Sequence, residues 1–547
     1  MTKVWYNLIM ENIKISNENQ TEYIKKLEEN VKRLEATCEL QKAHIEMLEQ
    51  KLEWFMEQIK LSQHKLFGSS SEQSQYDQTN IFNEAEKEAD VCVIEPELEE
   101  ITYKRKKRIG KKDEMLSVLP VETINYYLPE DEQGCPECGG NMHIMGKNIS
   151  RELKIIPAQV MVVEHVQHIY SCRGCENFSD STPIVKSVVA EPVIKGSMAS
   201  PSLVAYIMSQ KYLTAIPLYR QEQEFQRLGI DISRQTMANW VIRCAADWLE
   251  PLYDILKEFL RNRQVLHADE TVLQVLKEPG KTPQSNSYMW LYRTSGDTKE
   301  PIILYEYQPD RRAKRPQEFL EGFKGFLHSD GYAGYHCLQK DIIVCGCLSH
   351  ARRKFDEVLK SIKPAEQIGS KALTGKNYCD QLFSLEKKFA DLTPEDRYTK
   401  RLELAKPILD KFFEWLKSVN ALPKSALGKA VQYTLSQWVY IVNYLLDGRC
   451  EISNNRAERS IKVFVIGRKN FLFADTVRGA KASAIIYSII ETAKENGLNP
   501  MKYLTYLFEK MPNLDFKNNP DLFECVLPWG NLPQDCYLKK SKDPKDD

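Results

Sequence analysis

Apolar residues near the N-terminus recur every three or four positions over five heptads. One seam position is filled by Ile24, Val31, Cys38, Ile45, Leu52 and Ile59. The other is filled by Leu27, Leu34, Leu48 and Phe55, with Gln41 as a polar exception. This 3.5-residue period predicts a left-handed coiled coil over residues 20–67, and β-branched residues opposite Leu favour a parallel dimer or higher oligomer. A single long helix packed on its own globular body is the alternative.

The next change in pattern is a loss of periodicity over residues 68–115, which we interpret as a charged linker. Residues 84–100 hold eight Asp or Glu against one Lys, and residues 104–112 hold seven Lys or Arg. The basic run can neutralise DNA phosphates, through Lys104, Arg105, Lys106, Lys107 and Arg108. A solvated tether that balances the acidic run is an equally good reading.

Helical periodicity returns in three short segments within residues 196–260. Gly229 stands where a turn is needed before the third segment, and Ser233 is a good N-cap for it. A helix-turn-helix would present the start of that helix to the DNA major groove, so the candidate base contacts are Arg234, Gln235 and Asn239. A three-helix packing unit without DNA contacts has the same pattern.

From residue 262 the pattern changes to strands. Three consecutive strands, a crossover helix and further strands predict a mixed α/β sheet. Asp269 falls within the first strand and Asp330 ends the fourth. If these strands pair, the two carboxylates meet at one edge, where they repel unless a cation such as Mg²⁺ or Mn²⁺ intervenes. We expect His267 and His328 to pack at the strand ends and to bind no metal.

A third acid is needed, and it follows an almost wholly helical stretch at residues 361–448. Glu458 lies on a helix beside a buried apolar stripe, within residues 449–481, which hold eight Lys or Arg and only three acids. A lone carboxylate in a positive field fits a metal ligand beside a bound phosphate. The alternative is a capping box formed by Asn455 and Glu458.

Two Cys-x-x-Cys pairs predict a structural zinc site, because four thiolates can surround Zn²⁺ tetrahedrally and leave no position open for water. The pairs are Cys135 with Cys138 and Cys172 with Cys175. The residues between the pairs read as a β-hairpin arm. Redox cysteines or coincidence are the alternatives.

Composition adds little about function. The 75 basic residues balance the 76 acidic ones, so any argument for nucleic acid is local. The chain shows no signal peptide, and no apolar run approaches the ~20 residues that cross a bilayer. We therefore expect a soluble protein of the reducing cytoplasm, without a membrane partner.

Several segments together resemble the insertion sequence 66 family of bacterial DDE transposases, in particular its large subunit. They are "HADET", "SDGYAGY", "CLSHARRKF" and "NNRAERSIKVFVIGRKNFLF", preceded by "LFGSSSE" and "KYLTAIPLYRQEQEF" and followed by "IYSIIETAKENGLNPMKYL". The resemblance spans about residues 45–510. It implies an RNase H-like core with a helical insertion, catalytic positions at Asp269, Asp330 and Glu458, and small accessory proteins from the same element.

The expected protein is thus a multidomain α/β and α chain. Its parts are a coiled coil (20–67), a charged linker (68–115), a zinc ribbon-like domain (116–190), a helix-turn-helix-like domain (196–260), an RNase H-like core (262–360 and 449–495), a helical insertion (361–448) and a C-terminal helical tail (496–547). Further DNA contacts are expected from His350, Arg352, Arg353, Arg456, Arg459, Arg468 and Lys469. For the histidine and two arginines of the "HARR" segment, an ordinary amphipathic helix face is the alternative.

The acids imply two-metal hydrolysis of a phosphodiester at the element's end, followed by attack of the freed 3′-hydroxyl on double-stranded target DNA. Such a protein would work at the bacterial nucleoid. One rival is an RNase H-like nuclease that stops at hydrolysis. Another is a non-enzymatic zinc-dependent DNA-binding regulator, in which the acids only shape turns and caps.

Overall fold

A computed structural model describes residues 184–516 and 518–538, residues 159–171, and positions 5, 7, 10, 24–26, 29–42, 44, 45, 47, 48, 51, 52 and 56. The chain divides into two compact units. The first comprises Met1–Ser70 with Tyr253–Ser488, and the second comprises Ser71–Leu252 with Ile489–Asp547.

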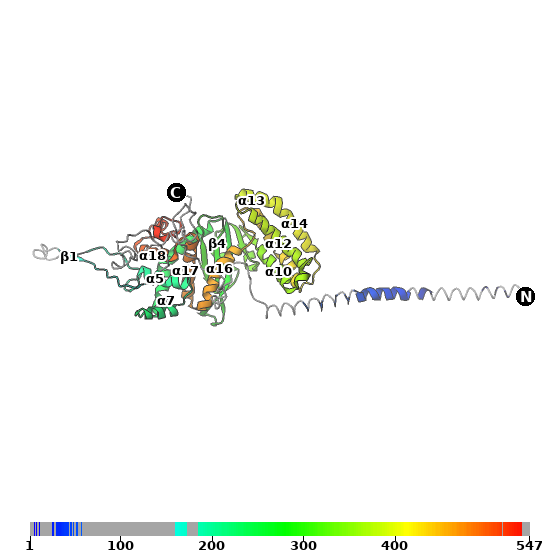
Figure 1. The fold of residues 1–547 in the computed structure, drawn as a ribbon, viewed down its shortest axis with the longest axis horizontal. Helices are drawn as coiled ribbons and strands as arrows, with labels where there is room; N and C mark the ends of the chain where they lie inside the picture. The colour runs from blue at the N-terminus through cyan, green and yellow to red at the C-terminus, as the bar shows by residue number, and fades with distance from the viewer. Residues whose placement is uncertain are drawn as a thin grey trace, which may run out of the picture. The chain divides into compact units, whose positions relative to one another are not determined.

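The first unit is built on a mixed sheet (Figure 1). Its strands are β3 (Val265–Lys277), β4 (Asn286–Thr294), β5 (Ile303–Gln308), β6 (Gly325–Ser329), β7 (Ile342–Gly346) and the short β8 (Ala474–Thr476). The order is β5-β4-β3-β6-β7, with β8 also on β3. β3, β4 and β5 pair antiparallel, whereas β3, β6 and β7 pair parallel. The predicted mixed sheet, with its first strand beside its fourth, is confirmed.

The centre of the sheet is apolar on both sides because the chain supplies near-continuous runs of large residues there. Trp290, Leu291 and Tyr292 on β4 and Leu304 and Tyr305 on β5 are fully buried. Such runs are typical of strands covered on both faces. Other helices around these strands in sequence are α8 (Glu250–Arg261), α9 (Lys314–Phe319), α16 (Asn455–Phe471) and α17 (Val477–Glu495), of which α16 packs on β3 and β4.

The helical stretch predicted after the sheet is present. It contains α10 (Leu348–Ser361), α11 (Pro364–Gln367), α12 (Lys371–Lys388), α13 (Pro394–Lys400), the π-helical turn η4 (Arg401–Ala405), α14 (Lys406–Ser418), α15 (Ala426–Ile441) and η5 (Val442–Leu446). Figure 1 shows α10, α12, α13 and α14 gathered together. Leu409, Phe412 and Leu416 of α14 are buried one or two turns apart, which gives the helix one apolar face.

In the second unit, the three predicted helices are α5 (Pro201–Tyr212), α6 (Leu218–Arg227) and α7 (Arg234–Cys244). Gly229 adopts a φ of 79° in the turn before α7, as only glycine does easily. Ser233 caps α7 by accepting a hydrogen bond from the backbone of Thr236 at 3.2 Å. The unit also contains η2 (Ala245–Leu249) and α18 (Pro500–Lys510), which packs on α5.

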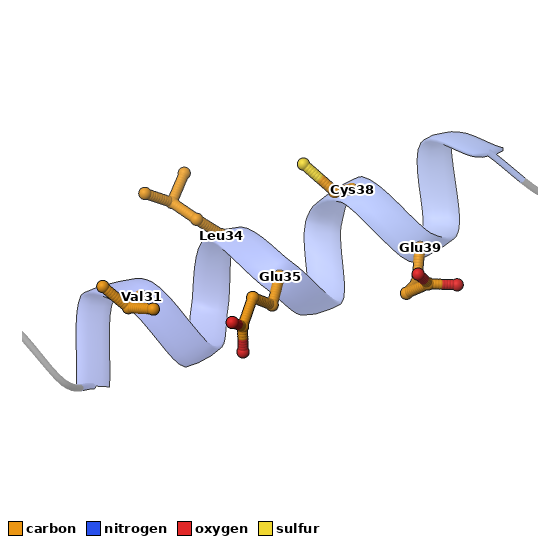
Figure 2. A pocket seen from close by; sticks show the side chains of 5 residues that line it. All are labelled: Val31, Leu34, Glu35, Cys38 and Glu39. Atoms are coloured by element: carbon orange, nitrogen blue, oxygen red, sulfur yellow. The ribbon is translucent and has the colours of Figure 1, made fainter.

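The described residues between 24 and 56 are all helical, as the heptads predict. Val31, Leu34 and Ile45 are exposed apolar residues of this helix. Figure 2 shows Leu34 and Cys38 projecting from the same side of it, as seam residues four apart should. The described positions are thus helical, and pairing with a second copy stays a prediction.

The predicted β-hairpin arm between the cysteine pairs is described only over residues 159–171. Of these, residues 159–168 form no strand, and Ile169–Ser171 form β1. β1 pairs antiparallel with β2 (Ile184–Lys186), which lies beyond the second cysteine pair. In the described part of the chain, no helix is long and apolar enough to span a bilayer.

Candidate active site at the ends of β3 and β6

Asp269 and Asp330 come together because of the parallel register of their strands. His267 on β3 pairs with His328 on β6. Each aspartate stands two residues further along its own chain segment, so both reach the same end of the sheet. Asp269 lies within β3, whereas Asp330 directly follows the last residue of β6. Each aspartate therefore lies, relative to its strand, where the sequence pattern predicted.

Both histidines pack as expected. The side chains of His267 and His328 are fully buried, and their rings stack with centroids 4.5 Å apart. Nε2 of His328 accepts a hydrogen bond from the backbone N–H of Glu451 at 3.1 Å. These rings therefore support the strand ends from within the core.

The electrostatics of Asp269 reflect the neighbouring acids. Burial raises the pKa of its carboxyl well above the ordinary value, and the negative charges of Glu270, Asp330 and, more weakly, Glu458 raise it further. The backbone N–H of Glu270 donates to Asp269 Oδ1 at 2.8 Å and offsets part of this effect. The structure therefore gathers negative charge at this end of the sheet without compensating it fully.

This raised pKa predicts that Asp269→Asn stabilises the protein in the absence of divalent metal. The native state prefers the protonated carboxyl, so stability is lost as pH rises through the raised pKa, and Asn imitates the protonated form. We expect a higher Tm for the variant in EDTA at about pH 8, with the difference shrinking toward about pH 5. The exposed Asp391→Asn is the control. An unchanged or lower Tm at pH 8 would contradict the assignment.

Asn454 holds the start of α16 against β3. Its side-chain Nδ2 donates to the carbonyl of Ala268 at 2.8 Å, and its Oδ1 lies 3.1 Å from Nδ1 of His267. Its backbone N–H donates to Sγ of Cys347 at 3.1 Å. The carbonyl and the imidazole belong to the two residues that precede Asp269, so Asn454 fixes where the first turn of α16 lies relative to that acid.

Glu458 is in that first turn, and its carboxylate does not complete the capping box considered above. The N-cap is Asn454, whose side chain caps nothing. Instead, Glu458 Oε2 accepts a hydrogen bond from Nη2 of Arg353 at 2.9 Å. Its Oε1 lies 3.6 Å from Nδ1 of His350, and neither atom has a hydrogen-bond partner. Burial lowers the pKa of His350, so this imidazole is neutral at pH 7.

The three acids approach one end of the sheet, but they do not all share one ligand-sized space. In the described part of the chain, two groups have potential ligand atoms within 4.8 Å of one another. They are Cys347 with His350 and Glu458, and His328 with Cys345 and Cys450. Glu458 nevertheless has a buried Oε1 that accepts no hydrogen bond, and the carboxyl of Asp269 lies among other acids. Both features fit a hard divalent cation, which prefers carboxylate oxygens.

The basic residues of α10 and α16 differ in their surroundings. Arg353 contacts Glu458, whereas Nε of Arg352 donates to Asp380 of α12, which also binds Lys376 at 2.6 Å. Arg352 therefore supports the helical insertion.

On α16, Arg456 donates to Glu451 at 2.8 Å, Arg468 is half-buried, and Arg459 and Lys469 are exposed. Of these four residues, only Arg459 and Lys469 are exposed to solvent, as residues that contact DNA phosphates should be.

The candidate reading positions on α7 are accessible. Arg234, Gln235 and Asn239 are exposed, while Met237 and Trp240 on the same helix are buried. The remaining predicted sites lie outside the described residues: the zinc ligands Cys135, Cys138, Cys172 and Cys175, and the basic residues Lys104, Arg105, Lys106, Lys107 and Arg108.

Four residues of the site were not predicted from the sequence: Glu270, Arg311, Tyr335 and Asn454. Glu270 lies beside Asp269, yet strand alternation alone would place it on the opposite face. Arg311 follows β5 in a run of charged residues that looks like an ordinary loop. The repeated Asn before "RAER" was the one usable signal, since Asn is common at helix starts.

Comparison with known proteins covers most of the chain. Residues 196–482 match the model for the transposase IS66 family, and residues 132–176 match the zinc-finger binding domain of transposase IS66. Residues 488–529 match the IS66 C-terminal element, and residues 54–124 match a model described as transposase C of IS166 homeodomain.

Two similar proteins come from Sinorhizobium fredii (strain NBRC 101917 / NGR234), where both are described as uncharacterized. Protein y4jD is 31% identical over 430 residues, which cover 76% of this chain and 81% of y4jD. Protein y4hP is 30% identical over 415 residues, which cover 72% and 73% of the two chains. The family matches span the sheet, the helical insertion and the C-terminal helices, and the chain belongs to the IS66 family of transposases.

Proposed function

We propose that this chain is a DNA transposase that binds the ends of an insertion sequence, hydrolyses a phosphodiester at the 3′ end and joins the freed 3′-hydroxyl to target DNA. The observation that carries the proposal is the β3–β6 register, which brings Asp269 and Asp330 to one end of the sheet. Asn454 supports it, because its bonds to β3 hold the helix of Glu458 nearby.

The core of this enzyme is RNase H-like. Two features of the sheet support that assignment. Three antiparallel strands are continued by two parallel strands, and one acid lies on the central strand while another follows its parallel neighbour. The acid on α16 is the third member. A helical insertion separates it from the second in sequence, as the family resemblance implies.

Asp269, Asp330 and Glu458 would hold Mg²⁺ or Mn²⁺. When bound, such ions supply Lewis acidity for a water nucleophile and for the leaving oxygen. Arg353 donates to one oxygen of Glu458 and so orients the other. The neutral His350 beside that oxygen can accept a proton or contact a phosphate.

The reaction needs no covalent bond between protein and DNA. In the first step, the oxygen of water bonds to phosphorus while the bond to the 3′ oxygen of the element breaks, and that oxygen leaves as a hydroxyl. In the second step, the same hydroxyl attacks a phosphodiester of the target, and a target 3′ oxygen leaves. The exposed Arg459 and Lys469 would bind phosphates beside the site.

Other parts of the chain would supply recognition and assembly. The exposed start of α7 would read the element's ends in the major groove, and the basic run at 104–112 would add contacts to phosphates. Zn²⁺ held by Cys135, Cys138, Cys172 and Cys175 would stabilise the domain that matches the zinc-finger model. The heptad helix would pair two copies.

The test of this function uses the full-length protein, Mg²⁺ and a labelled fragment that ends in the element's terminal inverted repeat. We expect cleavage at the 3′ end and, with a pre-cleaved end and a plasmid target, covalent joining of the label to the plasmid. Cleavage without joining would favour a nuclease that stops at hydrolysis. DNA binding with neither reaction would favour the regulator.

A further inference from the structure

A fourth buried acid, Glu270, lies beside the proposed metal ligands, but its own oxygens are already occupied. Only 1% of its side chain is exposed. Oε1 accepts a hydrogen bond from Nε of Arg311 at 2.7 Å, with Nη2 also in contact, and Oε2 accepts one from the hydroxyl of Tyr335 at 2.6 Å. A carboxylate engaged in this way is satisfied without a metal.

Arg311 also contacts the segment that carries Asp330. Its guanidinium carbon lies 4.0 Å from the centre of the Tyr332 ring, and the Tyr332 hydroxyl donates to the Arg311 carbonyl. The backbone N–H of Tyr332 donates to Oδ1 of Asp330 at 3.0 Å. One arginine thus joins the strand that contains Asp269 to the loop that contains Asp330.

Aromatic packing makes this loop rigid. Trp290 of β4 lies with its ring centre 6.4 Å from that of Tyr332 and 5.9 Å from that of Tyr335, and the two tyrosines meet edge to face. Gly334 permits the fold, since a Cβ there would come within 2.2 Å of the Tyr332 ring. A movement of Arg311 would therefore be transmitted to Asp330 and not absorbed by the loop.

The charges give Arg311 a second role. Asp269, Glu270 and Asp330 repel one another at short range, and Arg311 contributes a positive charge between strand and loop. Two nitrogens of its planar guanidinium contact the carboxylate of Glu270, while the face of the guanidinium stacks on the Tyr332 ring. A lysine would keep the charge, but its single ammonium could not bind Glu270 through two nitrogens and stack a planar face on Tyr332 at the same time.

We propose that Arg311 is a positioning residue for the metal site: by binding Glu270 and stacking on Tyr332, it sets the separation of Asp269 and Asp330. This inference rests on the proposed function, because it assumes that the two aspartates bind a divalent ion. It goes beyond that function by assigning metal affinity to a residue that supplies no ligand to the proposed ion. Residues that orient metal ligands typically change metal affinity by about 10–100-fold when replaced.

The test measures Mn²⁺ binding to the full-length protein without DNA, by electron paramagnetic resonance of the free ion. We expect Arg311→Gln to weaken Mn²⁺ binding by about tenfold or more, and Arg311→Lys to remain weakened, because charge alone does not restore the geometry. Arg312→Gln is the matched control, since its side chain is 82% exposed. Asp330→Asn, in the same titration, tests whether the aspartates bind the ion at all.

The outcomes separate the two proposals. Loss of binding in Asp330→Asn with wild-type affinity in Arg311→Gln would overturn the positioning role and leave the proposed function intact. Unchanged binding in Asp330→Asn would overturn both. If Arg311→Gln has a much lower Tm, Arg311→Lys decides, because it keeps the compensating charge. Full Mn²⁺ affinity in Arg311→Lys would then show that charge, and not the two-sided contact, is what matters, and would overturn the inference.

Discussion

Asp330→Asn should abolish metal-dependent cleavage of the element's ends and leave DNA binding unchanged. The carboxylate stands at the end of β6, beside Asp269, and is not among the residues proposed to contact DNA. An amide provides one neutral oxygen where a charged ligand is needed, so the loss of metal-assisted stabilisation should be several kcal/mol, or about a thousandfold in rate. Single-turnover cleavage in Mg²⁺ measures the rate, and a gel shift in EDTA measures binding.

Asp341→Asn is the matched control for this experiment. It lies just before β7, at the opposite end of the parallel β6–β7 pair from Asp330, and its side chain is 58% exposed and pairs with Lys324. Its cleavage rate should stay within about twofold of wild type, as expected for a surface change. If both variants cleave normally, or if Asp330→Asn loses DNA binding together with cleavage, the catalytic role of this acid is wrong.

Arg401→Ala should destabilise the first unit by about 3–5 kcal/mol, the effect expected when one partner of a buried ion pair is removed. The arginine side chain is 1% exposed and binds both oxygens of Glu386, at 2.9 and 2.6 Å. It also donates to the carbonyls of Tyr444, Asp447 and Cys450, at 3.2, 3.0 and 2.8 Å. Urea unfolding followed by tryptophan fluorescence measures the change, since Trp415 and Trp438 lie in the same helical insertion.

Lys406→Ala provides the comparison. Lys406 pairs with Asp410 at 2.9 Å, but both side chains are more than half exposed, so the loss should be below about 1 kcal/mol. A similar small loss for Arg401→Ala would mean that water replaces its contacts, and that the segment from Tyr444 to Cys450 does not depend on it.

Local patterns were sufficient for much of this architecture. Two apolar runs that end in His-Ala-Asp and His-Ser-Asp were enough to predict two buried strands that each carry an aspartate near one end, whereas their register is known only from the structure. Ser233 and Gly229 marked the start of α7 because caps and left-handed turns have narrow residue preferences.

What the sequence could not provide were contacts between residues distant in the chain. Asn454 is a plausible cap for its own helix, and only the folded chain shows that its amide binds β3 instead. Arg311 is 41 residues from Glu270, and nothing in a loop of charged residues distinguishes this arginine from Arg312. The predicted hairpin arm was too long because alternation of apolar residues does not reveal which strand partner exists.

The position of the helical insertion has a consequence for protein synthesis. Asp269 and Asp330 are translated before the insertion, and Glu458 is translated after it. Arg401, within the insertion, binds the carbonyls of the segment that leads to α16. A chain released early, anywhere within the insertion, carries two acids of the proposed three. Such premature products should not cleave DNA, because the proposed metal site also needs Glu458, which is translated only after the insertion.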